Sequence, residues 1–371
     1  MPKKIFISTG ELSGDIHASN LLKELRNIIP DLEAYAIGGD NLSNTGAKLI
    51  LHIKDVSVMG FIEVIKKYKN IKNMWKYATD TIKKLNPDIV ILIDYPGFNL
   101  KLARFCKKAG IKVIYYIVPQ VWAWGKNRVK TIKKYIDKVI CILPFEQDWL
   151  KSFGIDATYV GHPIVTHLRP EKAKENKQNG KISIAILPGS RDQEIKKHLP
   201  VMLRAIKLLK NKYQNLKTTV ALAPGIDARN LQKVHKDPGI KWVEDQTYKV
   251  INDSNIVLLS SGTATLETTL FHKPMVVCYK LSFLSYLIGR IIVNVKHIAI
   301  PNLIAGEKIV PELIQYKLTP ENIYNEVDKY ITNIAYRESV TRRLQEISKT
   351  LQKSNPSKAA AHIIAKYIHE N

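Results

Sequence analysis

Residues 255–267 read NIVLLSSGTATLE, and this stretch predicts both a fold and a binding site. Its apolar run has the length and composition of a strand buried on both faces, and the TATLETTLF pattern that follows is helical. Ser261, Gly262 and Thr263 lie between them, where small side chains leave the free N–H groups of the helix start open to an anion. We therefore predict a strand, turn and helix of a parallel sheet, with a diphosphate bound at the turn.

The same alternation of apolar strands and helical segments runs along the whole chain. The expected strands are KIFIS, EAYAI, DIVILID, KVIYYIV, KVICIL and ATYV in the first half, and KISIAIL, TTVALA, IKWV, NIVLL and MVVCY in the second. Strands of this kind separated by helices imply parallel sheets covered on both faces. The charged stretch at 169–181 is the expected linker. We predict an α/β protein with Rossmann-like domains over 1–168 and 169–345, and a C-terminal helix over 346–371 that packs back on one of them.

Charge is the unusual feature of the composition. The 371 residues include 57 Lys plus Arg against 33 Asp plus Glu, a formal net charge of +24. Such a field favours nucleic acid, a phosphorylated substrate or an anionic membrane surface, although a general bias toward lysine explains it equally well. The cysteines are far apart with no Cys/His cluster, as in a reducing cytoplasm, so we expect no metal site. We expect no signal peptide and no spanning helix, since Arg290 and Lys296 interrupt the most apolar stretch, 281–300.

The turn after the first expected strand reads STGELSGDIH. Gly10 and Gly14 allow tight turns, and Ser13 or Asp15 is placed to cap the helix that follows. The sequence is neither a P-loop nor a GxGxxG fingerprint. It is therefore either an ordinary strand-to-helix turn or a display site for the acid Glu11.

A second anion-type turn, LPGSRDQEI, lies at 187–195. Gly189 shapes the turn, Ser190 is placed to cap a helix, and Arg191 supplies a forked cation suited to phosphate oxygens. Glu267 lies one helical turn beyond Thr263, where a carboxylate accepts hydrogen bonds from a ribose diol. A surface arginine and an acid favoured by the helix dipole are the alternatives. The two turns together favour a nucleoside diphosphate.

Asp94 ends the strongly apolar strand DIVILID, before the turn YPG. A carboxylate at that point is partly desolvated, which raises its pKa toward that of a useful general base. The alternative is an Asp that caps a turn. His17, His162 and His167 have no metal-ligand spacing, and we interpret them as solvated or structural.

One lysine-rich helical stretch, over residues 58–84, has the pattern of a membrane-surface helix. Phe61, Ile65, Tyr68 and Trp75 fall on its apolar stripe, with lysines on both sides. Such a stripe fits either the protein core or an interface with lipid. Nucleic acid is not the expected partner, because no RRM, HTH or KH pattern appears and the basic residues are spread along helices.

Nine motifs carry a resemblance that covers nearly the whole chain. GELSGD, SVMGFIEV, IDYPGFN, PQVWAWGKNR, LPFE, GHP, LPGSR, SGTATLE and PNLIAG occur in the order typical of the lipid A disaccharide synthase family of GT-B glycosyltransferases. The resemblance implies two Rossmann-like domains facing across a cleft, inverting chemistry without metal or other cofactor, and peripheral attachment to the cytoplasmic face of the inner membrane of Gram-negative bacteria. The implied substrates are UDP-2,3-diacylglucosamine and 2,3-diacylglucosamine 1-phosphate; the products are a β(1→6)-linked disaccharide 1-phosphate and UDP.

The family's functional residues fall on positions of this sequence that match its motifs. They are Glu11, Asp94, Arg191, Glu267 and Asn302. The resemblance makes Asp94 the base with Glu11 in support, gives UDP to the turns at 189–191 and 261–263 with Glu267 and Asn302, and gives acyl chains to the Phe61–Trp75 stretch. Some members carry an aspartate where this chain has Gly97, which concentrates the base role on Asp94.

Two rival functions stay open on sequence alone. Another UDP-sugar enzyme of the same architecture, such as a UDP-N-acetylglucosamine 2-epimerase or a peptidoglycan-type N-acetylglucosaminyltransferase, would not need acylated donors. A non-catalytic basic protein that binds membrane or nucleic acid would release no UDP. The 281–300 segment is core, membrane contact or the interface of a possible homodimer.

Overall fold

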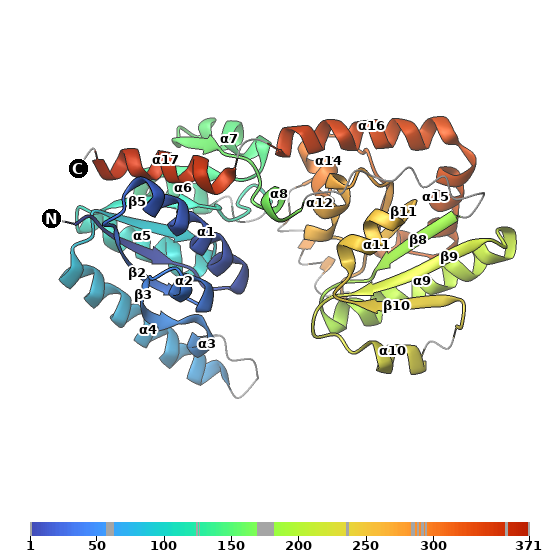
Figure 1. The fold of residues 1–371 in the computed structure, drawn as a ribbon, viewed down its shortest axis with the longest axis horizontal. Helices are drawn as coiled ribbons and strands as arrows, with labels where there is room; N and C mark the ends of the chain where they lie inside the picture. The colour runs from blue at the N-terminus through green and yellow to red at the C-terminus, as the bar shows by residue number, and fades with distance from the viewer. Residues whose placement is uncertain are drawn as a thin grey trace. The chain divides into compact units, whose positions relative to one another are not determined.

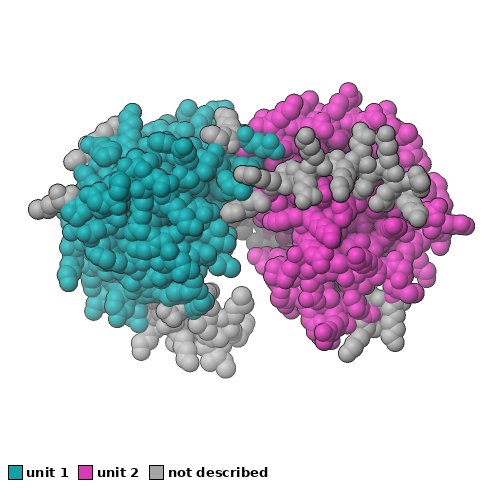
Figure 2. Space-filling view, in the orientation of Figure 1, with its two compact units in different colours: residues 1–166, 352–371 teal, residues 167–351 magenta. Residues whose placement is uncertain are grey.

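The computed structural model describes residues 2–56, 63–123, 125, 127–168, 182–234, 237–282, 286–287, 289–290, 293, 295–352 and 355–369. The chain forms two compact units, coloured separately in Figure 2. Unit 1 comprises residues 1–166 and 352–371, and unit 2 comprises 167–351. The expected boundaries were 168/169 and 345/346.

Unit 1, whose strands β2, β3 and β5 are labelled in Figure 1, contains a seven-stranded parallel sheet in the order β3-β2-β1-β4-β5-β6-β7. Its strands are β1 Lys4–Ser8, β2 Glu33–Gly38, β3 Lys48–His52, β4 Ile89–Ile93, β5 Lys112–Tyr116, β6 Lys138–Cys141 and β7 Ala157–Tyr159. All five residues of β4 are buried. Since side chains alternate along a strand, Val90 and Leu92 join the apolar cluster on one face of the sheet, and Ile89, Ile91 and Ile93 join that on the other.

Helices cover both faces of this sheet. They are α1 Leu12–Ile28, α2 Asp40–Asn44, α3 Ile53–Val56, α4 Glu63–Leu85, α5 Pro96–Lys108, α6 Asn127–Tyr135 and α7 Pro144–Lys151, with α8 Ile164–His167 at the unit boundary. The last helix, α17 Pro356–His369, returns to pack on α1. Its Ala360, Ile364 and Ile368 are fully buried in the cluster that α1 contributes to.

Unit 2 contains a six-stranded parallel sheet in the order β10-β9-β8-β11-β12-β13. Its strands are β8 Ile182–Leu187, β9 Leu216–Leu222, β10 Ile240–Glu244, β11 Ile256–Ser260, β12 Met275–Tyr279 and β13 Glu312–Ile314. Its helices are α9 Asp192–Lys212, α10 Ala228–Val234, α11 Thr247–Asp253, α12 Thr263–Leu270, α14 Ile300–Ala305, α15 Pro320–Thr332 and α16 Ile334–Leu351, with the 3-10 turn η1 Gln315–Lys317. This is the strand order of dinucleotide-binding Rossmann folds.

The predicted fold class, two Rossmann-like units with parallel sheets, is confirmed. The strands β3 and β13, each at the edge of its sheet, were not expected from the sequence. The C-terminal helix expected over 346–371 is divided, since α16 ends at Leu351 in unit 2 and α17 begins at Pro356 in unit 1. Within the described part of the chain, no helix has the length and hydrophobicity needed to span a membrane.

Both sheets have a topological switch point, where the chain leaves neighbouring strands in opposite directions. In unit 1 the neighbours are β1 and β4, and in unit 2 they are β8 and β11. Ligands of open parallel sheets bind outside the carboxyl ends of such strands. The turns at 9–11 and 94–95 follow β1 and β4, and those at 188–191 and 261–262 follow β8 and β11, so the predicted site turns converge at the two switch points.

Candidate active-site residues and their family

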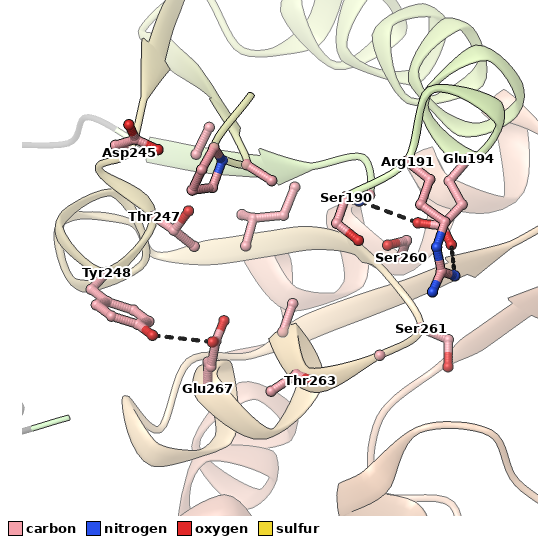
Figure 3. Close-up of a pocket in the computed structure, with 17 residues that line it drawn as sticks. Ser190, Arg191, Glu194, Asp245, Thr247, Tyr248, Ser260, Ser261, Thr263 and Glu267 are labelled. Carbon is pink, nitrogen blue, oxygen red and sulfur yellow. Dashed lines mark hydrogen bonds and ion pairs between the residues drawn. The ribbon is translucent and has the colours of Figure 1, made fainter. Parts of the chain in front are cut away.

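A pocket of about 620 Å³ opens at the switch point of unit 2 (Figure 3). Every predicted donor-binding residue except Asn302 lines it. The lining residues are Leu187, Gly189, Ser190, Arg191, Glu194, Ala221, Ala223, Pro224, Asp245, Thr247, Tyr248, Ser260, Ser261, Gly262, Thr263, Ala264 and Glu267. The arginine turn lies at one end of the pocket and Asp245 with Thr247 at the other. The two turns predicted to hold an anion are thus parts of one site.

The turn after β8 presents an exposed cation to the pocket. Arg191 is the N-cap residue of α9, and its side chain is 80% exposed. The predicted cap by Ser190 is wrong: the helix begins at Asp192, and the Ser190 N–H donates to the carboxylate of Glu194 at 3.2 Å. Gly189 has φ +135°, and a Cβ there would lie 2.7 Å from Glu194 Oε2, so only glycine fits.

A buried histidine fixes the base of this turn. The backbone N–H of Lys280, just after β12, donates to His198 Nε2 at 2.9 Å. The proton therefore sits on Nδ1, which donates to the carbonyl of Pro188 at 3.0 Å. Burial lowers the pKa of His198, which keeps it neutral and preserves both bonds.

Hydrogen bonds within unit 2 hold the turn after β11 in place. Gly262 is the N-cap residue of α12, and its carbonyl accepts a 2.7 Å hydrogen bond from Thr265 Oγ1. The Ser261 hydroxyl donates to the carbonyl of Ile298 at 3.0 Å, so it is already used in a bond within the protein. Because this helix has no acidic residue in its first turn, its positive end is uncompensated by a side chain.

Glu267 lines the same pocket and contacts Tyr248. The Tyr248 hydroxyl donates to Glu267 Oε1 at 3.3 Å, and its ring stacks on Phe271 with 6.4 Å between centroids. Burial raises the pKa of Glu267. Glu267 and Tyr248 therefore line the part of the pocket between Arg191 and Asp245 with a carboxylate, a hydroxyl and an aromatic ring.

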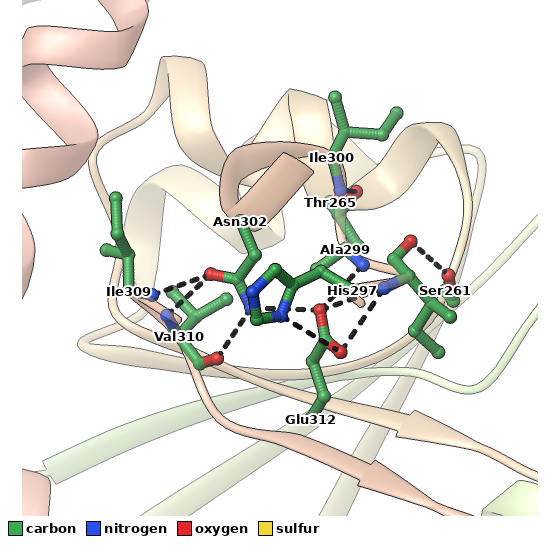
Figure 4. Close-up of polar contacts among 10 residues, drawn as sticks. Ser261, Thr265, His297, Ala299, Ile300, Asn302, Ile309, Val310 and Glu312 are labelled. Carbon is green, nitrogen blue, oxygen red and sulfur yellow. Dashed lines mark hydrogen bonds and ion pairs between the residues drawn. The ribbon is translucent and has the colours of Figure 1, made fainter. Parts of the chain in front are cut away.

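Asn302 does not line the pocket, which corrects its predicted contact with the donor. It is fully buried, and its amide oxygen accepts from the backbone N–H groups of Ile309 (2.8 Å) and Val310 (2.9 Å). Its amide nitrogen donates to the Val310 carbonyl and to Glu312 Oε1, both at 2.9 Å (Figure 4). Glu312 in turn accepts from the N–H groups of Ile298 and Ala299. Asn302 therefore supports the backbone that Ser261 contacts.

Asp94 sits on a strained turn at the switch point of unit 1. Asp94 (φ 46°) and Tyr95 (φ 50°) are consecutive residues in the left-handed region, which costs energy outside glycine. The Asp94 carbonyl accepts from Tyr115 Oη at 2.5 Å and from Asn99 Nδ2 at 2.8 Å. Asn99 is fully buried and also accepts from Ser8 Oγ at 2.7 Å, which links this turn to the end of β1.

Glu11 lies close enough to Asp94 to change its titration. Burial, and then the negative charge of Glu11, raise the pKa of the Asp94 carboxyl, as the sequence predicted for burial. Glu11 is exposed at the N-cap position of α1. A Cβ on Gly10 would lie 2.3 Å from the Tyr95 ring, so Gly10 is required by this close approach rather than by a positive φ.

Asp15 has a structural role that the sequence did not reveal. Neither Ser13 nor Asp15 caps α1, which begins at Leu12. The Asp15 carboxylate instead accepts from the backbone N–H groups of Gly39 (2.6 Å), Asn41 (3.0 Å) and Leu42 (3.3 Å) at the start of α2. The acid is fully buried and anchors α1 to the chain after β2.

The predicted membrane stripe lies only partly within the described structure. Phe61 is outside the described residues, as are the side chains of Ile65 and Tyr68. Trp75 packs edge-on against Phe98 and Phe105, at centroid distances of 5.9 and 6.1 Å. Trp75 is thus partly buried and packs against the core of unit 1, and its predicted contact with the membrane stays a prediction.

Two glutamates and two further side chains at these sites were not singled out from the sequence. Asn99 lies in IDYPGFN, just after a buried strand, and Glu194 lies in the anion turn LPGSRDQEI. These positions could have indicated both residues from the sequence. Glu146, in LPFE, is buried and accepts from Trp122 Nε1 at 3.0 Å. Tyr248 had no signal, since its place depends on how α11 packs. Among the described residues, no group of His, Cys, Asp and Glu has the arrangement of a metal site.

A family model described as lipid-A-disaccharide synthetase matches residues 5–365. The chain belongs to the lipid-A-disaccharide synthetase family. The lipid-A-disaccharide synthase of Myxococcus xanthus (strain DK1622) is 36% identical over 375 residues, covering 99% of this chain and 98% of that protein. The family resemblance read from the nine motifs is thereby confirmed.

Solved structures with low sequence identity share the fold of this family member. Acinetobacter baumannii MurG matches with a TM-score of 0.64 and 14% identity, covering 98% of this chain and 100% of that one. The S. aureus MnaA–UDP co-structure matches with a TM-score of 0.63 and 15% identity, covering 99% and 96%. At these identities the likeness supports the GT-B architecture alone.

Proposed function

We propose that this protein transfers the sugar of UDP-2,3-diacylglucosamine to 2,3-diacylglucosamine 1-phosphate, giving the β(1→6)-linked disaccharide 1-phosphate and UDP. Membership of the lipid-A-disaccharide synthetase family gives the reaction class, which is glycosyl transfer in lipid A disaccharide synthesis. The observation that carries the proposal for the site is that the LPGSR and SGTATLE turns line one pocket at the switch point of unit 2.

The pocket of unit 2 has the chemistry to hold UDP. The diphosphate would rest between Arg191 and the free N–H groups at the start of α12, where charge and helix dipole both favour an anion. The ribose diol would donate to Glu267. This leaves the end of the pocket formed by Asp245 and Thr247 for the uracil.

Asp94 is the group suited to act as base. Its carboxylate takes the proton of the acceptor's 6-hydroxyl as that oxygen bonds to the anomeric carbon from the side opposite UDP. The bond from this carbon to the β-phosphate oxygen breaks, and its electron pair leaves with UDP. A pKa raised by burial and by Glu11 brings Asp94 closer to the basicity such a transfer needs. Fixed donors and Arg191 stabilise the charge that develops on UDP.

The natural setting we infer is the cytoplasmic face of the inner membrane of a Gram-negative cell. Both substrates carry acyl chains in a lipid surface. The net charge of +24 favours approach to anionic headgroups, since each basic residue near such a surface adds to the attraction.

The test is UDP release by the purified protein from UDP-2,3-diacylglucosamine and 2,3-diacylglucosamine 1-phosphate, with EDTA present and the lipid product analysed by mass spectrometry. We expect a disaccharide 1-phosphate, and no UDP release when the acceptor is omitted. Turnover of UDP-N-acetylglucosamine, but not of the acylated donor, would instead assign the site to another UDP-sugar reaction.

A further inference from the structure

The carboxylate of Glu194 is bound to the same groups that would bind a phosphate. Glu194 lies in the first turn of α9 and lines the pocket of unit 2. Its Oε2 accepts the Ser190 N–H at 3.2 Å, and its Oε1 lies 3.1 Å from Nη1 of Arg191 (Figure 3). One backbone donor and one cation of the anion turn are therefore already bound to an acid of the same chain.

The surroundings of Glu194 hold its carboxylate in this place. Its side chain is only 21% exposed, whereas that of Arg191 is 80% exposed. The carboxylate lies beside Gly189, where a Cβ would come within 2.7 Å of Oε2. An acid in the first turn of a helix is also favoured by the helix dipole. Glu194 thus supplies this turn with an acidic partner from the same chain.

We propose that Glu194 competes with the diphosphate for the LPGSR turn and so limits the affinity of the protein for UDP. This inference rests on the proposed function, because it takes the pocket to be a UDP site. When phosphate oxygens approach Ser190 and Arg191, the carboxylate gives up these partners and stays as a like charge beside the ligand, which weakens binding. After transfer, the same carboxylate recovers its partners as UDP leaves, which favours product release.

The experiment compares the binding of UDP and of inorganic pyrophosphate by calorimetry in wild type, Glu194→Gln and a control. Glutamine keeps the size of the side chain and removes its charge. We expect Glu194→Gln to bind UDP about tenfold more tightly, and product inhibition by UDP to strengthen by the same factor. The control is Glu321→Gln in the first turn of α15, which removes one charge at another helix start outside this pocket and should leave UDP binding unchanged.

Glu194→Asp supplies a second variant should the glutamine protein not fold. Aspartate keeps the charge but is one methylene shorter, so it holds Ser190 and Arg191 less well, and we expect an intermediate gain in UDP affinity. UDP affinity that is unchanged or weaker in the folded variants would overturn the inference alone, because Glu194 would then organise the turn for the ligand. Absence of UDP and pyrophosphate binding in wild type and variants alike would overturn the proposed function as well.

Discussion

The two switch points of this protein share a topology and differ in the chemistry of their turns. In unit 1 the turns after β1 and β4 carry the acids Glu11 and Asp94, and burial together with the charge of Glu11 raises the pKa of Asp94. In unit 2 the strands β8 and β11 end in glycine and serine turns with a single exposed arginine. The roles that we propose follow this difference, with a proton acceptor in unit 1 and an anion site in unit 2.

The difference in chemistry between the two switch points comes from the backbone geometry of the turns, since the two sheets have similar strand orders. In unit 1, Asn99 and Tyr115 donate hydrogen bonds to the Asp94 carbonyl. These bonds hold the left-handed turn that places Asp94 directly after β4. In unit 2, small residues leave the start of α12 without an acidic side chain, and the dipole of this helix supplies a positive field there. Similar frameworks would thus take the different roles that we propose, because the chemistry lies in the turns that follow the strands and not in the sheets.

The largest effect should come from removing the base. Asp94→Asn should lower kcat by roughly 10²–10⁴-fold, the usual contribution of a general base, with the UDP dissociation constant unchanged. Asparagine is tolerated in the left-handed region as well as aspartate, so the turn at φ 46° should stay intact. Steady-state UDP release and UDP calorimetry on the same samples measure the two quantities.

Asp88→Asn is the matched control for this variant. Asp88 lies just before β4, at the amino end of the strand, where it accepts from Lys4 N at 2.7 Å. The control should keep its turnover. If Asp94→Asn also kept wild-type turnover, the carboxylate at the carboxyl end of β4 would not be the base.

Removing the exposed cation should affect the anion site instead. Arg191→Ala should weaken UDP binding roughly 10–100-fold, the equivalent of one charged hydrogen bond to phosphate. Arg204→Ala, on the same helix and likewise exposed, removes the same charge away from the pocket and should bind UDP normally. Equal UDP dissociation constants in the two variants, measured by calorimetry, would remove Arg191 from the diphosphate site.

The sequence predicts the strands of this protein where burial on both faces dominates. All eleven expected strands are found, because apolar runs such as IVILI are stable only when they are buried on both faces. The strands it misses, β3 and β13, are edge strands whose residues are partly exposed, so their composition gives only a weak apolar signal. They form because a neighbouring strand offers unpaired backbone groups.

Site residues are predictable when their chemistry depends on local sequence, and not when it depends on packing. The glycines and serines of the two anion turns and Asp94 at the end of β4 lie where the chain pattern places them. Asn302 and Asp15 were misassigned because their partners, in β13 with its preceding loop and in α2, come from other segments. A polar residue in a motif can serve a ligand or the backbone that holds the ligand, and only the three-dimensional partners distinguish these roles.

The smallest expected effect tests the coupling of the two acids in unit 1. Since the charge of Glu11 raises the pKa of Asp94, Glu11→Gln should lower that pKa. The base must be ionised to act, so kcat/KM falls as pH drops through its pKa. The acid limb of the pH profile should therefore move to lower pH in the variant.

Glu24→Gln, farther along α1, is the control for this shift. Glu24 lies on the same helix but accepts from Asn355 Nδ2 and is not among the groups that perturb Asp94. Its acid limb should coincide with that of wild type. Because Glu11 is exposed, the difference between wild type and Glu11→Gln should also shrink in high salt, which screens exposed charges. An acid limb that stays in place in Glu11→Gln would mean that burial alone sets the basicity of Asp94, and that Glu11 serves the substrate instead of the base.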